Sequence, residues 1–262
     1  FSSTLKSNLQ RSRTMIQQWW PEFHAGEIRS PAVTECPRAP GRALFFTGGV
    51  DSAFALRQLE GQVDELIFVE GFDVELADGA RLECIRRSLE TVAANTGHKL
   101  IVVRTNLRSH RKFQSVHWET AHVSALAAVA HTLGDHLGTV FVADSDVPPP
   151  FGSHPELDEL WSSDSVALRS IGAGSSRLQR VRAICDYSPA IGHLRVCWEN
   201  LAESLNCGHC KKCLLTRLQL RAAGDATEMR SFPDIPLVEA LERLVREDPG
   251  SRFPDFWRDL QS

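Results

Sequence analysis

The feature that most constrains the fold of this chain is a strand–turn–helix pattern in its first quarter. Residues 43–46 are all apolar, which is typical of a short buried strand in a parallel sheet. Gly48 and Gly49 follow, and because they lack a Cβ atom, the backbone can bend sharply and approach a ligand closely. Asp51 and Ser52 then occupy the first positions of a predicted helix, whose free N–H groups and partial positive charge suit a phosphate. The pattern therefore predicts an α/β fold with an anion-binding turn.

The whole motif spans Thr47 to Ser52 and reads Thr-Gly-Gly-Val-Asp-Ser. It is not a Walker loop, because no Gly-Lys-Ser/Thr follows. It resembles the PP-loop signature, Ser/Thr-Gly-Gly-x-Asp-Ser, of the ATP pyrophosphatases, also called the adenine nucleotide alpha-hydrolase-like superfamily. Thr47 keeps the hydroxyl of the more usual serine. The resemblance implies a loop that binds the pyrophosphate part of ATP in an enzyme that transfers AMP to a substrate oxygen. An ordinary Gly-Gly turn is the alternative interpretation.

Strands and helices alternate along the first two thirds of the chain, which predicts parallel βαβ units. We expect strands at 65–70, 100–103, 139–143 and 166–171, and helices at 53–59, 78–96 and 119–137. The predicted class is α/β, an open parallel sheet with helices on both faces, and the resemblance implies the HUP/PP-loop type. We expect three parts: a helical N-terminal extension (1–40), a nucleotide-binding α/β domain (41–190) and a C-terminal part with a zinc knuckle and helices (191–262). We expect this C-terminal part to be packed as one unit. The switch in strand order would place the ligand over the Gly48-Gly49 turn.

Further binding residues are expected where strands end. The resemblance implies that the backbone at Phe68 and Val69 meets the adenine ring, and core packing of Phe68 is an equal alternative. Asp144, after the fourth strand, could hold Mg²⁺ beside the phosphates or form a turn. Many PP-loop enzymes carry a Ser/Thr-Lys pair at a comparable point, and Ser176-Arg177 matches that place approximately. The planar guanidinium group of Arg177 can donate two hydrogen bonds to a phosphate. Arg180 or Arg182 could share that role. The alternative is that these arginines are ordinary charged residues of a surface helix.

Residues 148–164 show no periodicity and follow the carboxyl end of a strand. A loop of this length inside a compact domain is usually functional or disordered. We therefore predict a substrate loop or lid, with His154, Glu156 and Asp158 as candidates to contact the substrate. Simple solvation of each polar side chain is the alternative.

Four of the seven cysteines gather near the C-terminal end with the spacing C-x9-C-x2-C-x2-C, at Cys197, Cys207, Cys210 and Cys213. Four thiolates so spaced suit tetrahedral Zn²⁺, and a closed four-sulfur shell is structural. Lys211 and Lys212 would offset the negative charge of such a centre. An iron–sulfur cluster is the alternative, but adenylation needs no electron carrier. Clustered cysteines also favour a reducing compartment, so we expect a cytoplasmic protein.

Together the turn and the cysteines resemble the 7-cyano-7-deazaguanine synthases. The resemblance implies a ligase that activates a carboxylate or amide oxygen as its AMP ester, releases pyrophosphate, and forms a C–N bond with ammonia, giving an amide or nitrile. The loop residues Thr47, Gly48, Gly49, Val50 and Ser52 would hold the phosphates. Asp51 with Mg²⁺, and Arg177 at the α-phosphate, would be catalytic. The expected cofactors are ATP, Mg²⁺ and Zn²⁺.

Two alternatives remain at this point. One is a sulfurtransferase of the same superfamily, which usually needs a catalytic cysteine pair, and Cys84 and Cys185 show no such pairing. The other is a non-catalytic, nucleotide-binding zinc scaffold. The net charge of −4 disfavours a nucleic-acid partner, and no apolar run approaches the ~20 residues of a membrane span. We expect ATP and a small-molecule substrate as partners, with a homodimer as an option.

Overall fold

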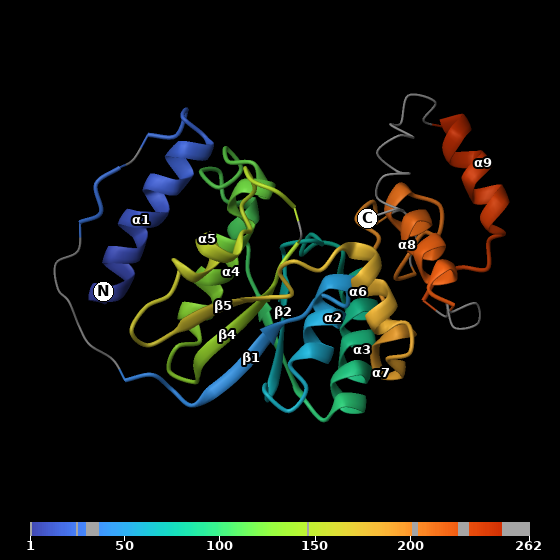
Figure 1. Ribbon diagram of the computed structural model, residues 1–262, viewed down its shortest axis with the longest axis horizontal. Coiled ribbons are helices and arrows are strands. Elements are labelled where there is room, and N and C mark those ends of the chain that lie inside the picture. Colours follow the sequence, from blue (N-terminus) through green and yellow to red (C-terminus); the bar gives the residue numbers. More distant parts are fainter. Residues whose placement is uncertain are drawn as a thin grey trace.

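The centre of the molecule is a five-stranded parallel sheet in the order β3-β2-β1-β4-β5 (Figure 1). The computed structural model describes residues 2–24, 26–29, 37–145, 147–200, 204–224 and 231–247. The strands are β1 (Gly41–Phe45), β2 (Glu65–Glu70), β3 (Lys99–Arg104), β4 (Leu137–Ala143) and β5 (Ala167–Ile171). The predicted α/β class and parallel sheet are confirmed.

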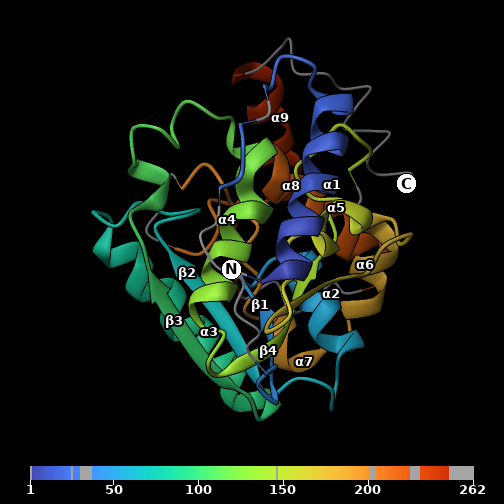
Figure 2. The ribbon, with the colours of Figure 1, turned by 90° about the vertical axis from the view of Figure 1, so that its left-hand side faces the viewer.

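Helices cover both faces of this sheet, as predicted. Successive side chains of a strand point to opposite faces, so Leu44 and Phe46 belong to one buried cluster and Ala43 and Phe45 to the other. The first face carries α2 (Val50–Gln58), α3 (Gly79–Thr96), α6 (Arg177–Ile184) and α7 (Ser188–Ile191). The second carries α4 (Trp118–Thr132), and α1 (Ser3–Trp19) and α5 (Pro155–Glu159) lie on the same side (Figure 2).

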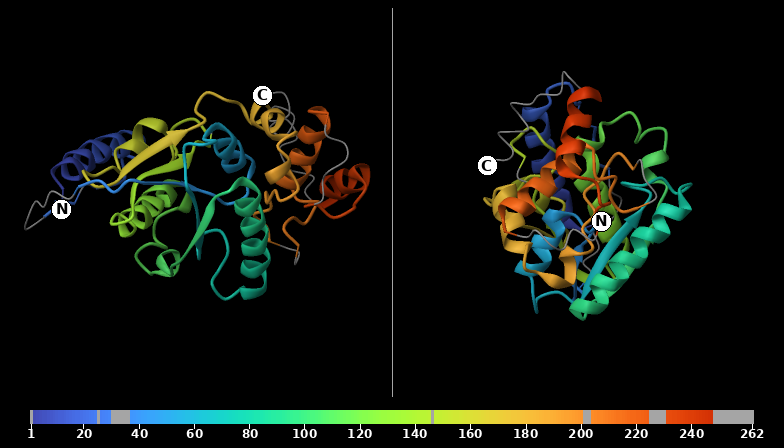
Figure 3. Two further views of the ribbon diagram at one scale, coloured as in Figure 1. Left: turned by 90° about the horizontal axis from the view of Figure 1, so that it is seen from below. Right: turned by 90° about the vertical axis from the view of Figure 1, so that its right-hand side faces the viewer.

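The remaining helices are a 3-10 turn, η1 (Leu107–Ser109), and the pair α8 (Lys211–Ala222) and α9 (Leu237–Glu247). Figure 3 shows α1 and α9 at opposite ends of the molecule. Cys197, Cys207, Cys210 and Cys213 belong to the same buried cluster as the α2 and α3 side of the sheet. The cysteine region is therefore packed onto the sheet. Among the described residues, no helix combines the length and the apolar character needed to cross a membrane.

One predicted boundary is wrong. The sequence predicts a helix over 119–137 with Gly138 as its stop, but α4 ends at Thr132 and Leu137 already belongs to β4. Gly138 is a strand residue, and a Cβ atom there would lie 1.9 Å from the Ala39 carbonyl oxygen. A glycine is required at position 138 because the backbone of another segment passes too close for a side chain. The sequence around Gly138 gives no sign of this contact.

The switch in strand order lies between β1 and β4. The chain passes from β1 through β2 to β3 on one side and then returns to place β4 and β5 on the other. In open parallel sheets, ligands bind at the carboxyl ends of the strands at such a point. The Thr47–Ser52 turn follows β1 and Asp144 follows β4, so both lie at this position.

Candidate functional site

The glycine turn joins β1 to α2 and is shaped by one left-handed residue. Gly48 has a φ of +76°, and a Cβ atom there would lie 3.1 Å from a methyl group of Leu89. Gly49 is the N-cap of α2 and has extended backbone. The N–H groups of the first helical turn have no partner inside the helix. The turn therefore presents backbone donors, beside the exposed Thr47, at the carboxyl end of β1.

One predicted donor is directed elsewhere. The hydroxyl of Ser52 is buried and donates to the Gly49 carbonyl oxygen at 3.1 Å. In this arrangement the hydroxyl of Ser52 stabilises the turn, and the donors that face outward are backbone amides and Thr47. The anion-binding capacity thus belongs mainly to the backbone.

Arg180 of α6 connects three elements beneath the turn. Its guanidinium is 1% exposed and contacts Asp51 Oδ1 at 2.9 Å and Asp144 Oδ1 at 3.2 Å. It also donates to the carbonyl oxygens of Asp144, Gly172 and Ser175. The start of α2 is thereby joined to the carboxyl ends of β4 and β5. From sequence, Arg180 was expected only to share the role of Arg177, because its acidic partners Asp51 and Asp144 are 129 and 36 residues away in the chain.

Arg177 lies over the other oxygen of the same aspartate. Its Nη1 is 3.8 Å from Asp51 Oδ2, and its Nη2 donates to Thr216 Oγ1 at 3.0 Å. The structure therefore brings together Asp51 and Arg177, the two residues predicted to be catalytic. It also places Arg177 between the glycine turn and α8.

Two further cations, Arg195 and Lys212, are considered with this region. The sequence analysis did not predict either of them as a residue of the nucleotide site. The N–H of Arg195 donates to the Gly48 carbonyl oxygen at 2.8 Å. Its guanidinium donates to Asn200 Oδ1 at 3.1 Å and lies 3.9 Å from Asp73 Oδ2. Desolvation by burial lowers the pKa of Arg195. An arginine buried so close to the turn contributes positive charge where an anion would bind.

Lys212 is the second cation. It is the second residue of α8, and its Nζ lies 5.3 Å from the centre of the Trp198 ring. Burial lowers the pKa of Lys212, the charge of Arg177 adds to the decrease, and the charges of Asp51 and Asp73 oppose it. The position of Lys212 follows from the fold of the cysteine region.

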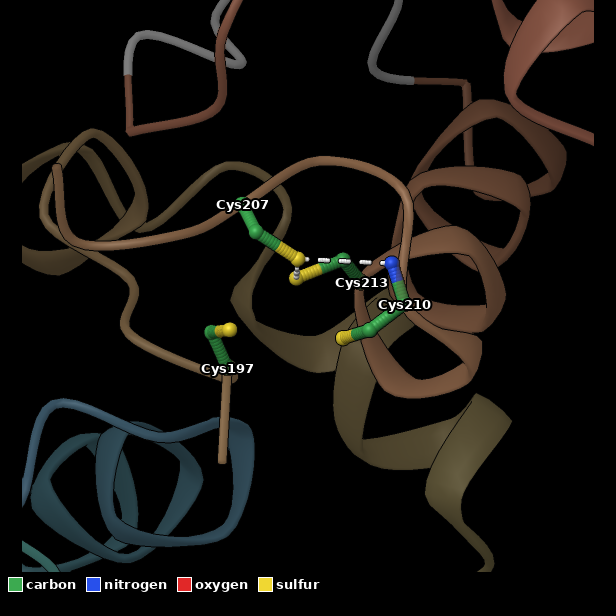
Figure 4. Close-up of side chains that lie close together, drawn as sticks. All are labelled: Cys197, Cys207, Cys210 and Cys213. Atoms are coloured by element: carbon green, nitrogen blue, oxygen red, sulfur yellow. Dashed lines mark hydrogen bonds between the residues drawn. The ribbon is translucent and has the colours of Figure 1, made fainter. Parts of the chain in front are cut away.

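The four cysteines converge as predicted (Figure 4). Their sulfur atoms all lie within 4.8 Å of one another, and all four residues are buried. The Cys207 and Cys213 sulfurs are 3.9 Å apart, which agrees with the ~3.8 Å edge of a tetrahedron with Zn–S bonds of ~2.3 Å. The N–H of Cys210 donates to Cys207 Sγ at 3.3 Å. This arrangement fits a metal ion held by four thiolates.

The protonation of the cluster depends on contacts among its thiols. Hydrogen bonds from Cys210 and Cys213 lower the pKa of Cys197, and the contact with Cys197 raises the pKa of Cys210 to about 12. A divalent cation would favour ionisation of all four thiols. His209, between Cys207 and Cys210 in the chain, is not part of this group, and its Nδ1 lies 2.8 Å from the Cys207 carbonyl oxygen.

The predicted adenine contacts lie in β2. Phe68 and Val69 are both buried, and the Phe68 side chain belongs to the core cluster on the α2 side of the sheet. The Phe68 ring therefore packs in the core, as the alternative interpretation held. Contact of the adjoining backbone with an adenine ring stays a prediction.

The predicted substrate loop contains a short helix, α5, and its candidate residues have protein partners. His154 caps α5 through Nδ1, and its ring packs against Trp19 with centroids 5.5 Å apart. Glu156 lines a cleft between α1 and β5. Asp158 is fully buried and accepts hydrogen bonds from the Ser153 hydroxyl and the His154 N–H, both at 3.1 Å. A substrate role for these residues stays a prediction.

The buried carboxyl of Asp158 gives a testable dependence on pH. Desolvation raises its pKa from 3.8 to about 7, a difference that corresponds to about 4 kcal/mol. The folded protein holds this proton more tightly than the unfolded chain does. The stabilisation is therefore complete below pH ~4 and is lost as the pH rises to ~7. We expect Asp158→Asn to remove this slope and to be the more stable protein above pH ~7.

Urea unfolding of wild type and Asp158→Asn at several pH values measures this effect. Asp135→Asn is the control, because Asp135 is exposed and its replacement should leave the slope unchanged. An equal slope in wild type and Asp158→Asn would contradict the assignment.

The described part of the chain thus brings a glycine turn together with two acidic side chains and the guanidinium groups of Arg177 and Arg180, and the Arg195 N–H joins that turn to the segment that leads into the four-cysteine cluster. Comparison with protein-family models, with curated proteins and with solved structures found no significant match to this chain. The chemistry of the site must accordingly be argued from its residues.

Proposed function

We propose that this protein is an ATP-dependent adenylating enzyme whose sheet is of the HUP/PP-loop type. One observation carries the proposal. The Thr-Gly-Gly-Val-Asp-Ser turn lies at the switch point of a parallel sheet, at the start of a helix, with Arg177 directly above Asp51. Helix N-termini at such positions bind phosphates through free N–H groups and a partial positive charge.

The roles of the residues follow from this geometry. Backbone amides of residues 48–52 would bind the β- and γ-phosphates of ATP. Arg177 would stabilise the charge that develops at the α-phosphate when a substrate oxygen attacks it and pyrophosphate leaves. Asp51 orients Arg177 and Arg180 through its two carboxylate oxygens. Mg²⁺ is expected to accompany ATP, and ammonia would attack the resulting AMP ester, so that a C–N bond forms as the C–O bond to AMP breaks and AMP leaves.

The acceptor would lie in a cleft at the same edge of the sheet. This cleft measures about 780 Å³ and is lined by residues 71–75 and 113–118, with Asp78, Arg108 and Asn200 among the other lining residues. Asn200 donates to the Asp73 carbonyl oxygen at 3.3 Å and accepts from Arg195, which bonds to Gly48. The wall of the cleft is thereby joined to the phosphate turn, so an acceptor bound there would adjoin the nucleotide.

The described cysteines favour C–N bond formation over sulfur transfer. Cys197, Cys207, Cys210 and Cys213 form one buried group suited to a metal. Cys84 and Cys185 lie on separate helices or helix ends and are only partly buried. A sulfur-transfer mechanism usually requires a reactive, accessible cysteine with a partner.

Exchange of labelled pyrophosphate into ATP tests the proposal. A panel of carboxylic acids is supplied with ATP and Mg²⁺, and exchange is expected with the acid that the enzyme activates. Arg177→Met should lower that exchange by roughly 100-fold, the usual effect of removing one transition-state donor. Arg182→Met is the matched control, because Arg182 is an exposed arginine on the same helix. Binding of an ATP analogue away from residues 47–52 would overturn the proposal.

A further inference from the structure

Arg108 is an arginine of the acceptor cleft that the proposed reaction leaves without a role. It lines the cleft, and among the described lining residues no other is a lysine or an arginine. It is the middle residue of η1, in which the Ser109 N–H donates to the Asn106 carbonyl oxygen at 3.0 Å. This turn follows β3, so Arg108 lies at the edge of the sheet formed by the carboxyl ends of the strands, where ligands bind in such folds.

Two contacts hold the Arg108 guanidinium in place. Its Nη1 donates to the Phe72 carbonyl oxygen, and its Cζ lies 4.6 Å from the centre of the Trp118 ring. The Trp118 ring in turn packs against the Phe72 ring, with centroids 5.0 Å apart. A guanidinium that already lies over an aromatic ring has its plane oriented before a ligand arrives, so binding costs it little conformational freedom.

The Arg108 guanidinium has no carboxylate partner among the described residues, since it takes part in none of their ion pairs. Three carboxylates do line the cleft. Those of Asp73 and Asp78 lie 3.9 and 2.7 Å from other arginines, and Glu75 is exposed to solvent. Within the described part of the chain, the Phe72 carbonyl is the acceptor bonded to Arg108. Most N–H donors of this guanidinium are therefore available to a ligand.

The residues that follow η1 add positive charge beside Arg108. His110, Arg111 and Lys112 are all exposed. Ser109 and Phe113, which flank them in the chain, line the cleft, so the three side chains lie at its rim. Exposed cations at the mouth of a cleft attract anions from solvent, although salt screens the effect.

Arg108 is separated from the turn at which the proposed reaction would occur. The glycine turn follows β1, whereas the Arg108 guanidinium is bonded to residue 72, beyond the end of β2. Neighbouring strands are spaced by about 4.8 Å, which exceeds the distance between the two oxygens of one carboxylate. An oxygen that attacks ATP at the turn and an anion bound at Arg108 would therefore belong to two different groups of the acceptor.

We propose that Arg108 binds a second anionic group of the acceptor, a carboxylate or a phosphate, and so selects acceptors that carry such a group in addition to the one that is activated. This inference rests on the proposed function, because it names the substrate class of the same site. The planar guanidinium can donate two parallel hydrogen bonds to either kind of anion.

Matched pairs of acids test the inference on the full chain. Glutarate and isophthalate are each compared with their monomethyl esters, and phosphoglycerate is compared with glycerate, so that each pair differs by one anionic group. Calorimetry with Mg²⁺ and the non-hydrolysable analogue AMPCPP measures binding, and pyrophosphate exchange is measured separately. At least one pair should show wild type binding the more charged member about 10- to 100-fold more tightly, as expected for a charge-assisted contact.

Arg108→Met should reduce that ratio to within about twofold of one, and Arg108→Lys should retain part of it. Arg111→Met is the matched control, because it removes an exposed, screened charge from the same segment and should leave the ratio unchanged. A purely structural role would weaken both members of a pair equally, since the loss would not depend on the charge of the ligand. The two kinds of pair distinguish a carboxylate from a phosphate.

Four results separate the possible failures. A ratio near one for every pair in wild type would overturn the inference and leave the proposed function standing wherever exchange is seen. Equal loss of both members in Arg108→Met would likewise overturn it, in favour of a structural role. A charge-dependent ratio that requires Arg108, without exchange for any acid, would contradict the proposed function alone. Absence of both binding and exchange for every acid would contradict both.

Discussion

Replacing Arg180 with methionine is expected to lower the free energy of unfolding by about 3–5 kcal/mol. The Arg180 guanidinium is buried and is paired with Asp51 and Asp144, of which Asp144 is itself buried. Methionine would leave the buried Asp144 carboxylate without its cation, along with unpaired carbonyl oxygens. For a chain of this size the melting temperature should fall by roughly 10 °C. Urea and thermal unfolding measure the two quantities.

A second substitution identifies the cause of that loss. Asp144→Asn in the Arg180→Met background removes the uncompensated charge, so the double variant should recover part of the stability. Arg182→Met is the control for removing an arginine from α6, and it should change the free energy of unfolding by less than ~0.5 kcal/mol. A double variant no more stable than Arg180→Met would show that the ion pair is not the source of the effect.

The other large effect is expected from loss of the metal centre. Cys213→Ser should abolish stoichiometric zinc binding, because one of four ligands in a closed shell is lost. Structural zinc sites contribute on the order of 10 kcal/mol to folding in small peptides, so the region around α8 should unfold locally. Elemental analysis measures the zinc, and hydrogen exchange of residues 194–222 measures the unfolding.

Cys84→Ser is the control for this experiment, since Cys84 lies outside the cluster. Its zinc content and exchange rates should equal those of wild type. Exchange of the Arg195 amide should rise in Cys213→Ser but not in Cys84→Ser, because that N–H, two residues before Cys197 in the chain, donates to the Gly48 carbonyl oxygen. Iron in place of zinc would support the iron–sulfur alternative. Unchanged zinc content in Cys213→Ser would contradict the assignment of the ligands.

The sequence determined those features whose cause is local. The apolar run at 43–46, the two glycines and the following helix predicted the turn, and the cysteine spacing predicted the cluster. The alternation of strands and helices predicted a parallel sheet with helices on both faces. Each of these follows from backbone stereochemistry or from the reach of residues a few positions apart, so the pattern and its structural cause occupy the same stretch of chain.

Only the tertiary structure decided which distant side chains share the site. Nothing around Arg180 indicates that Asp51 and Asp144 would be its partners, and nothing around Arg195 indicates that its N–H would donate to the Gly48 carbonyl oxygen. Gly138 belongs to a strand for a similar reason, because the backbone that excludes a side chain comes from residue 39. A charged side chain specifies the kind of partner it needs, whereas the packing of elements far apart in sequence selects the individual residue.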